Sequence, residues 1–163
     1  MIVPEWPGES GPGLTSIKAA LRRPAMMAVD TDGRRDMAAF EESIRKLAKR
    51  NEDFRREVAT GAHSQVVLMC LQPGEGIGEE VHGDTDQIFI VVKGGGEAVL
   101  DGAIRALEKG TLLLVPAGMR HDVRNTGDKR LRLVTIYSPP HHAPGTVHAT
   151  REEAMRAEGE GHA

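Results

Sequence analysis

The sequence has few of the features that would indicate a disulfide framework, a membrane span or a nucleic-acid surface. Cys70 is its only cysteine, which excludes an intrachain disulfide and favours a reducing, cytoplasmic compartment. No stretch approaches the about 20 consecutive apolar residues of a membrane span. A net charge of −3 offers no broad cationic surface for nucleic acid or anionic lipid. We therefore expect a cytoplasmic protein that binds small molecules and neither nucleic acid nor membrane.

Aromatic residues are also scarce, at 3% of the chain, so aliphatic side chains must build most of the core. The length of 163 residues is typical of one domain. Residues 1–33 begin with a segment rich in Pro, Gly and Glu, and we expect them to form a flexible extension with at most two weak helical turns at 14–21. Within residues 34–63, apolar side chains recur at three- and four-residue steps over 36–58, which predicts a helix that packs on the rest of the fold.

From residue 64 onward, short apolar runs alternate with turn residues, which indicates a strand-rich region. The pair Asp101-Gly102 is favoured by two-residue hairpin turns. Eight strands crowded into residues 65–137 leave no room for crossover helices, so the sheets should be antiparallel. The expected strands are 65–71, 80–83, 87–93, 97–100, 104–107, 111–115, 121–125 and 131–137.

The C-terminal residues 141–163 combine a loop rich in His and Pro with a short helix. Thr150 followed three residues later by Glu153 is a capping box, which predicts that a helix starts at residue 151 and runs to 158. The fold class expected from these patterns is all-β, with one helix before the strands and one after them.

Two motifs in the strand region resemble the conserved motifs of the cupin superfamily. The run PGEGIGEEVHGDTDQIFIVVKG has the spacing of the first motif, which falls here on Gly74, Glu80, His82, Gln87 and Gly94. The second motif falls on Gly110, Pro116, Gly118, His121 and Asn125. The resemblance covers residues 64–140 and implies a cupin double-stranded β-helix, a jelly-roll barrel, with one divalent metal ion in its mouth.

The spacing has a physical reason that is independent of the resemblance. Residues two apart in a strand share a face, so Glu80 and His82 can point to the same place. Gln87 begins the returning strand, and His121 comes from a later one. Two imidazoles and a carboxylate suit Fe, Mn, Ni, Cu or Zn, and the sequence does not distinguish among them.

The predicted metal ligands are therefore Glu80, His82, Gln87 and His121, and they depart from the usual cupin set at two positions. Glu80 stands where the family most often has His, and Gln87 stands where it most often has Glu. The set is similar to the Gln, His, Glu and His ligands of phosphomannose isomerase, with Gln and Glu exchanged. A neutral amide oxygen is a weaker donor, so Gln87 is either a loose ligand or a group beside the ligands.

Candidates for proton transfer are Tyr137, His142 and His148, because a histidine-rich loop that covers the barrel mouth would supply an acid or base near neutral pH. The alternative, that the loop folds back elsewhere, is left open. Arg120 and Arg124 flank His121, but strand alternation directs them away from it. We interpret the acidic residues at 84 and 86 as turn residues.

Three functions remain open. The first is a metal-dependent enzyme, similar to isomerases and epimerases, that acts on a sugar-like or keto-acid-like molecule with the ion as Lewis acid. The second is an Fe- or Cu-dependent dioxygenase, and the third is a non-catalytic binding or sensing module. Exposed edge strands further predict a homodimer.

Overall fold

The computed structural model describes residues 39–160, which form nine strands and two helices. The expected flexible extension over 1–33, with its helical turns at 14–21, lies outside the described residues. In chain order the elements are α1 (Ile44–Arg50), β1 (Arg55–Thr60), β2 (Gln65–Leu71), β3 (Asp86–Lys93), β4 (Gly96–Leu100), β5 (Ala103–Leu107), β6 (Leu112–Val115), β7 (His121–Arg124), β8 (Leu131–Ser138), β9 (Val147–His148) and α2 (Arg151–Glu160).

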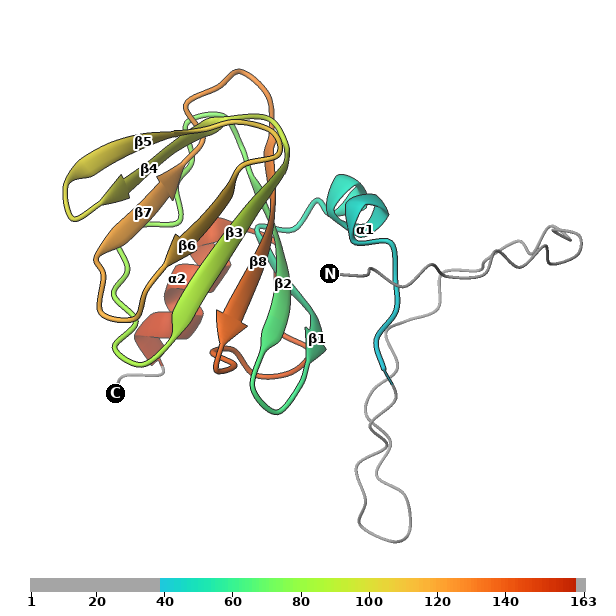
Figure 1. The fold of residues 1–163 in the computed structure, drawn as a ribbon. Coiled ribbons are helices and arrows are strands. Elements are labelled where there is room, and N and C mark those ends of the chain that lie inside the picture. The colour runs from blue at the N-terminus through green and yellow to red at the C-terminus, as the bar shows by residue number, and fades with distance from the viewer. Residues whose placement is uncertain (1–38, 161–163) are drawn as a thin grey trace, which may run out of the picture. The chain divides into compact units, whose positions relative to one another are not determined.

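The strands form two antiparallel sheets that face each other (Figure 1). The larger sheet has the order β6-β3-β8-β2-β1-β9, and the smaller has the order β5-β4-β7. Every strand pair in both sheets is antiparallel. This arrangement confirms the expected all-β double-stranded β-helix with one helix before the strands and one after them.

The main core lies between the two sheets and is mostly aliphatic, as the scarcity of aromatic residues requires. Strand β3 shows how the pattern produces it: Gln87, Phe89 and Val91 are buried, and Ile88 and Ile90 between them are only half-buried. Successive side chains point to opposite faces of a strand, so one face of β3 enters the core and carries Gln87 with it.

The hairpin between β4 and β5 turns at the expected pair. Leu100 pairs with Ala103, so the loop has two residues, Asp101 and Gly102. Both residues have positive φ, at 46° and 86°, which is the conformation that a type I′ turn requires and that Asp-Gly sequences favour.

The helix predicted over 36–58 is wrong in extent. Helix α1 has only seven residues and ends at Arg50. The next residue, Asn51, has an extended backbone, and its side-chain amide donates to the carbonyl of Asp53 at 2.8 Å. Arg132 of β8 also donates to the carbonyl of Asn51. Phe40, expected on the apolar face of the helix, precedes it and is 49% exposed.

The second half of the predicted helix is strand β1. Its sequence, RREVAT, contains good helix formers, but β1 pairs with β2 on one side and with β9 on the other. The sheet therefore overrides the local preference. Helix α1 still packs as expected, on the outer face of the larger sheet, where Ala48 meets Leu68 and Val134.

Helix α2 begins with the Thr150 half of the predicted capping box, and the Glu153 carboxylate bonds one residue before the N-cap instead of the N-cap itself. The Glu153 backbone N–H donates to the Thr150 hydroxyl at 3.3 Å, and the Glu153 carboxylate accepts from the Ala149 N–H at 2.7 Å. Ala154 is fully buried in the main core and holds the helix against the barrel. Neither helix among residues 39–160 is long and apolar enough to cross a membrane.

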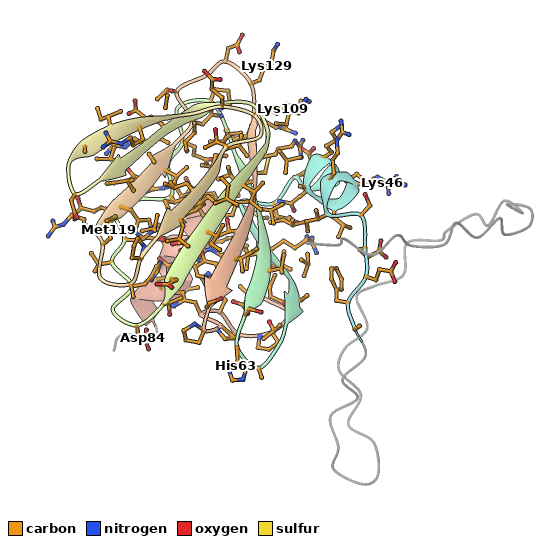
Figure 2. The ribbon with its side chains drawn as sticks, viewed as in Figure 1. Lys46, His63, Asp84, Lys109, Met119 and Lys129 are labelled. Atoms are coloured by element: carbon orange, nitrogen blue, oxygen red, sulfur yellow. The ribbon has the colours of Figure 1, made fainter. Side chains whose placement is uncertain are left out.

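Different side chains lie at the two ends of the paired sheets (Figure 2). His63 and Asp84 lie at one end, and Lys109 and Lys129 lie at the opposite end. The end with His63 and Asp84 is where β2 and β3 begin and β8 finishes, so it brings together residues that are far apart in the sequence.

Candidate metal site

Glu80 and His121 are joined through their backbones. The Glu80 N–H donates to the His121 carbonyl at 2.8 Å, and the His121 N–H donates to the Glu80 carbonyl at 3.0 Å. These bonds form an isolated bridge, so the strand expected over 80–83 is reduced to one residue pair. The His82 carbonyl accepts from Gly118 at 2.7 Å, which fixes the same segment again two residues later. This short segment is thereby held against the start of β7.

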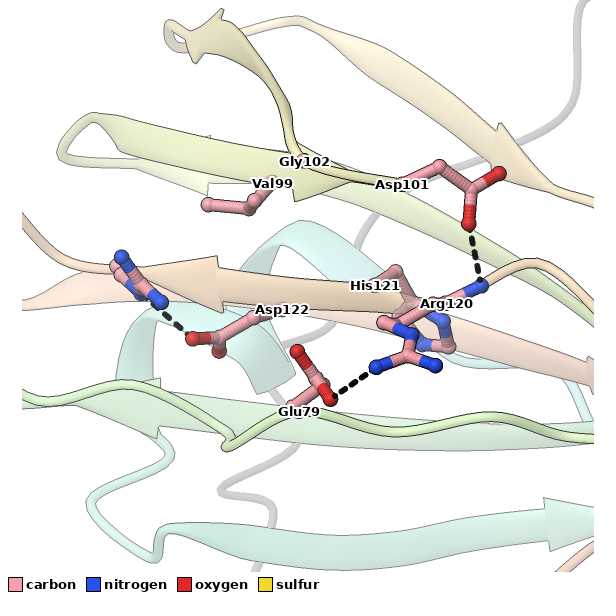
Figure 3. Close-up of a pocket in the computed structure, with 8 residues that line it drawn as sticks. Glu79, Val99, Asp101, Gly102, Arg120, His121 and Asp122 are labelled. Atoms are coloured by element: carbon pink, nitrogen blue, oxygen red, sulfur yellow. Dashed lines mark hydrogen bonds and ion pairs between the residues drawn. The ribbon is translucent and has the colours of Figure 1, made fainter.

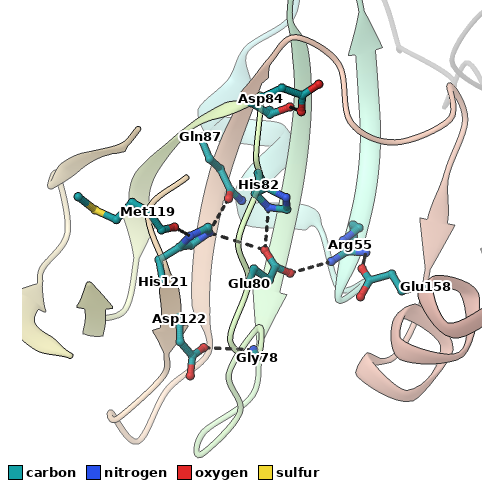
Figure 4. Close-up of polar contacts among 11 residues, drawn as sticks. Arg55, Gly78, Glu80, His82, Asp84, Gln87, Met119, His121, Asp122 and Glu158 are labelled. Atoms are coloured by element: carbon teal, nitrogen blue, oxygen red, sulfur yellow. Dashed lines mark hydrogen bonds and ion pairs between the residues drawn. The ribbon is translucent and has the colours of Figure 1, made fainter. Parts of the chain in front are cut away.

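The side chains of Glu80, His82 and His121 converge at this bridge (Figure 4). Oε2 of Glu80 lies 3.2 Å from Nε2 of His82 and 3.8 Å from Nε2 of His121. Each residue offers one ligand atom, and the three atoms lie within 4.8 Å of one another. Within residues 39–160 this is the one such group of three. The His121 side chain is 1% exposed and that of Glu80 is 14% exposed, so the group is largely shielded from solvent.

Gln87, the fourth predicted ligand, reaches the same place from the second position of β3. Its Oε1 lies 2.7 Å from Nε2 of His121, and the residue is 1% exposed. Its Nε2 is buried and has no hydrogen-bond partner among the described residues. The amide therefore directs its oxygen toward the ligand group.

The hydrogen bonding of His121 shows that a metal ion fits this donor set. Nδ1 of His121 lies 3.0 Å from the carbonyl oxygen of Met119, and because that oxygen can only accept, Nδ1 carries a hydrogen. In neutral imidazole the lone pair is then on Nε2, which faces Oε1 of Gln87, a second lone-pair donor. Nε2 of His121 and Oε1 of Gln87, 2.7 Å apart, can serve as two neighbouring ligands of one metal ion. A carbonyl that fixes the outer nitrogen is also the usual arrangement behind metal-binding histidines.

A buried arginine that the sequence pattern did not reveal lies beside Glu80. Arg55 of β1 is 1% exposed; its Nη1 lies 2.5 Å from Oε1 of Glu158, and its Nη2 lies 3.6 Å from Oε1 of Glu80 (Figure 4). Its position was assigned to a helix, so nothing in the sequence connected it with the site. The segment RREVAT does not alternate polar and apolar residues, so no local pattern indicated a strand there.

The histidine-rich segment returns to the site. The ring of His141 lies 4.3 Å from the ring of His82, centroid to centroid, and stacks on Tyr137 at 5.5 Å. The ring of His142 meets those of Tyr137 and His141 at 5.0 and 4.9 Å. Of the three histidines in this segment, His141 is the one in ring contact with a predicted ligand, and the sequence analysis did not select it.

Gln65, the first residue of β2, holds this segment in place. It is fully buried, its Nε2 donates to the His142 carbonyl at 2.7 Å, and its Oε1 accepts from the His142 N–H at 2.9 Å. His148 is held separately, because β9 pairs it with Arg55. Side-chain amides at the start of a strand are common in sequences, so no pattern indicated this role.

Burial decides the protonation of these groups. It lowers the pKa of His141, with His82 as the next cause, and lowers that of His142 to about 3, with the positive charge of Arg55 second. Burial and then Arg55 also lower the pKa of His148. The pKa of Tyr137 is raised by burial first and by the charge of Glu80 second. At neutral pH the three imidazoles are therefore uncharged and the phenol is protonated.

A groove of about 400 Å³ lies next to β7, but of the predicted ligands only His121 lines it (Figure 3). Arg120 pairs with Glu79 at 3.0 Å, and Arg124 pairs with Asp122 at 2.6 Å. Each cation in the groove thus has a carboxylate partner, and neither arginine reaches the metal ligands.

The acidic residues beside the ligands make one local and one long-range hydrogen bond. Oδ1 of Asp86 accepts from the Ala117 N–H at 2.9 Å, and Oδ1 of Asp84 accepts from the Thr85 hydroxyl at 3.2 Å. In these bonds neither carboxylate accepts from the backbone of residues 83–86, where both were expected to bond, and Asp86 instead holds the turn before β7. Within the described residues, neither carboxylate belongs to the group that could hold a metal ion.

Comparisons with known proteins point to one family. Residues 67–137 match the family model described as "Cupin domain". Protein YrkC of Bacillus subtilis is 39% identical over 125 residues, covering 73% of this chain and 67% of that protein. A protein of Streptomyces cyaneus named polyketide synthase CurC is 36% identical over 108 residues, covering 64% of this chain and 70% of that protein. The crystal structure of a Bacillus halodurans protein, 41% identical, superposes with a TM-score of 0.72 and covers 74% of this chain and 96% of that one.

Proposed function

Because the chain belongs to the cupin family, we propose that it is a metal-dependent enzyme acting on a small, oxygen-rich molecule. The observation that carries the proposal is the convergence of Glu80, His82 and His121, whose ligand atoms lie within 4.8 Å of one another. Two imidazoles and one carboxylate suit a divalent first-row transition metal. Gln87 adds a neutral oxygen on the same side as His121.

A metal ion at this site would act as a Lewis acid that polarises a carbonyl or enediolate oxygen. The surrounding side chains suit the movement of a proton next to that oxygen. His141 lies against His82 and stacks on Tyr137, so an imidazole that can accept a proton and a phenol that can donate one lie beside the ligands. His142 and His148, selected from the sequence, lie farther along the same segment and remain predicted participants. This distribution of an acceptor and a donor supports an isomerase-like or epimerase-like reaction.

The substrate class follows from the same chemistry. A carbonyl or enediolate has the hard oxygen donors that such an ion binds, as in a sugar or a keto acid. The relative named polyketide synthase is consistent with this class, because polyketides carry reactive carbonyl groups.

A dioxygenase is the second candidate, and the composition of the ligand group favours it specifically. Two histidines and one carboxylate with open positions form the facial set of non-haem Fe(II) oxygenases. Consumption of dioxygen with an enolisable substrate would distinguish this reaction from isomerisation. Tight ligand binding in calorimetry without conversion would instead indicate a binding module.

The test is metal analysis of protein purified without chelator, followed by titration with Mn²⁺, Fe²⁺, Co²⁺, Ni²⁺, Cu²⁺ and Zn²⁺. We expect one ion per chain, and we expect His121→Ala to lower the affinity at least 100-fold because it removes a ligand. His63→Ala is the matched control, since His63 is an exposed histidine outside the ligand group. If His121→Ala binds metal ions as tightly as His63→Ala does, the site is refuted. A metal-loaded protein that turns over no member of a carbonyl and sugar panel would refute the enzymatic part.

A further inference from the structure

Arg55 connects the C-terminal helix to the candidate metal ligand Glu80. Its guanidinium is buried between two carboxylates, one from α2 and one from the ligand group. A buried guanidinium is strongly destabilising unless carboxylates surround it, so its position is fixed by these partners. Glu158, the α2 partner, is 41% exposed and gives the closer contact.

Arg55 contacts one particular oxygen of Glu80. Its Nη2 lies 3.6 Å from Oε1, whereas Oε2 is the oxygen that faces His82 at 3.2 Å and His121 at 3.8 Å. The two oxygens of the carboxylate are thus divided between a cation on one side and the ligand group on the other (Figure 4). Oε2 is therefore the Glu80 oxygen that is placed to hold a metal ion together with the two histidines.

Glu158 shares Arg55 with Glu80. In the contacts described here, one guanidinium faces two carboxylates, so Glu80 is not its sole acidic partner. If Glu158 were neutral, Arg55 would have Glu80 as its one carboxylate partner among the contacts described here. Arg55 would then compete with a metal ion for that carboxylate.

The helix is placed to keep this contact. Ala154 is fully buried in the main core, and Nε of Arg151 donates to the Gly76 carbonyl at 2.8 Å, in the segment that leads to Glu80. Two contacts therefore join α2 to the barrel, one in the core and one on the segment that carries a ligand. Glu158, one turn beyond Ala154, extends this face toward Arg55.

We propose that Arg55 and Glu158 are positioning residues for the metal site: Glu158 on α2 neutralises Arg55, which orients Glu80 to bind the metal ion through Oε2. The inference rests on the proposed metal site and adds to it that docking of α2 and metal binding are coupled. Because such coupling is reciprocal, a bound ion stabilises the docked helix.

The test uses the full chain and Co²⁺ as the probe metal. Glu158→Gln removes the charge from a partly exposed position, so the variant should fold, and we expect its affinity for Co²⁺ to fall about tenfold, as is typical when a group supporting a ligand is lost. The visible spectrum of bound Co²⁺ should also shift, because the coordination of Glu80 changes. Glu152→Gln is the matched control: it makes the same change on an exposed residue of the same helix, and it should bind Co²⁺ as the wild type does.

A second measurement separates positioning from a merely structural role. In the wild type, Co²⁺ should slow amide hydrogen exchange in α2, and in Glu158→Gln this metal-dependent slowing should be lost. Arg55→Lys keeps the positive charge without the planar fork and should show the same loss. Equal Co²⁺ affinity, spectrum and α2 exchange in the wild type and Glu158→Gln would overturn the inference while leaving the metal site intact. Failure of the wild type to bind Co²⁺ would overturn the metal site and the inference together.

Discussion

Oε1 of Gln87 lies 2.7 Å from Nε2 of His121, although the two residues are 34 positions apart in the chain. Strand β3 supplies one of them and β7 the other, and the backbone of His121 is fixed in turn by Glu80. The contact places the amide oxygen where a fourth ligand would be. It also gives the most direct way to test how the substitution of Gln for the usual Glu affects this site.

Gln87→Glu should raise the affinity for Zn²⁺ or Co²⁺ about tenfold, because a carboxylate is a stronger donor than an amide oxygen. Without metal the same variant should be less stable than the wild type, since it buries a carboxylate. Gln87→Met keeps the size, removes the oxygen donor and should weaken binding. Titration calorimetry measures the metal affinity of the wild type and of both variants. Equal affinity in all three proteins would show that Gln87 does not bind the metal ion.

Gly96→Ala should destabilise the fold by about 3 kcal/mol. A Cβ atom on Gly96 would lie 2.0 Å from the carbonyl oxygen of Arg124, and backbone atoms of the paired β7 cannot move away without breaking the β4–β7 ladder. Gly83→Ala is the control, because a Cβ there meets nothing within 4 Å. Urea unfolding of both variants checks the prediction, which fails if Gly96→Ala is as stable as Gly83→Ala.

Acid should destabilise the protein through His142. Its pKa is about 3 in the folded chain against an ordinary value of 6.5, because burial and the charge of Arg55 disfavour the imidazolium. The unfolded chain therefore binds a proton that the folded chain does not, and the free energy of unfolding falls as the pH drops from 6.5 toward 3. Above pH 6.5 His142 is neutral in both the folded and the unfolded chain, so it no longer lowers the free energy of unfolding.

The variant His142→Gln should lose this part of the pH dependence, on the order of 2 kcal/mol at about pH 5. Urea unfolding of the wild type and the variant across the acidic range measures it. His63→Gln serves as the control, because His63 is exposed in the turn between β1 and β2 and its replacement should keep the wild-type profile. A His142→Gln profile parallel to that of the wild type would contradict the assignment.

The homodimer expected from exposed edge strands stays a prediction, and β6 is the strand at which to test it. It lies at the edge of the larger sheet, pairs with β3 on one side, and exposes Leu112 and Leu114 by 63% and 50%. We expect light scattering to give the mass of a dimer, and Leu114→Arg to give that of a monomer. Ile104→Arg, on β5 of the smaller sheet, should remain dimeric. A monomeric wild type would refute the prediction.

Much of this protein could be predicted from local sequence patterns. Alternation located β3 and the strands around it, the Asp-Gly pair fixed the β4–β5 turn, and Thr150 with Glu153 marked the start of α2. Motif spacing likewise selected His82 and His121. These features depend on residues near one another in the chain, or on a spacing that the family shares, so a sequence is enough to find them.

Only the tertiary structure decided what Arg55 and His141 do. Arg55 belongs to a segment of helix-forming residues that becomes β1 because β2 and β9 supply its hydrogen bonds, and this pairing brings it to Glu80 and Glu158. His141 reaches His82 because buried Gln65 holds the neighbouring backbone. Strand pairing and burial are set by partners far along the chain, so no local window of sequence contains them.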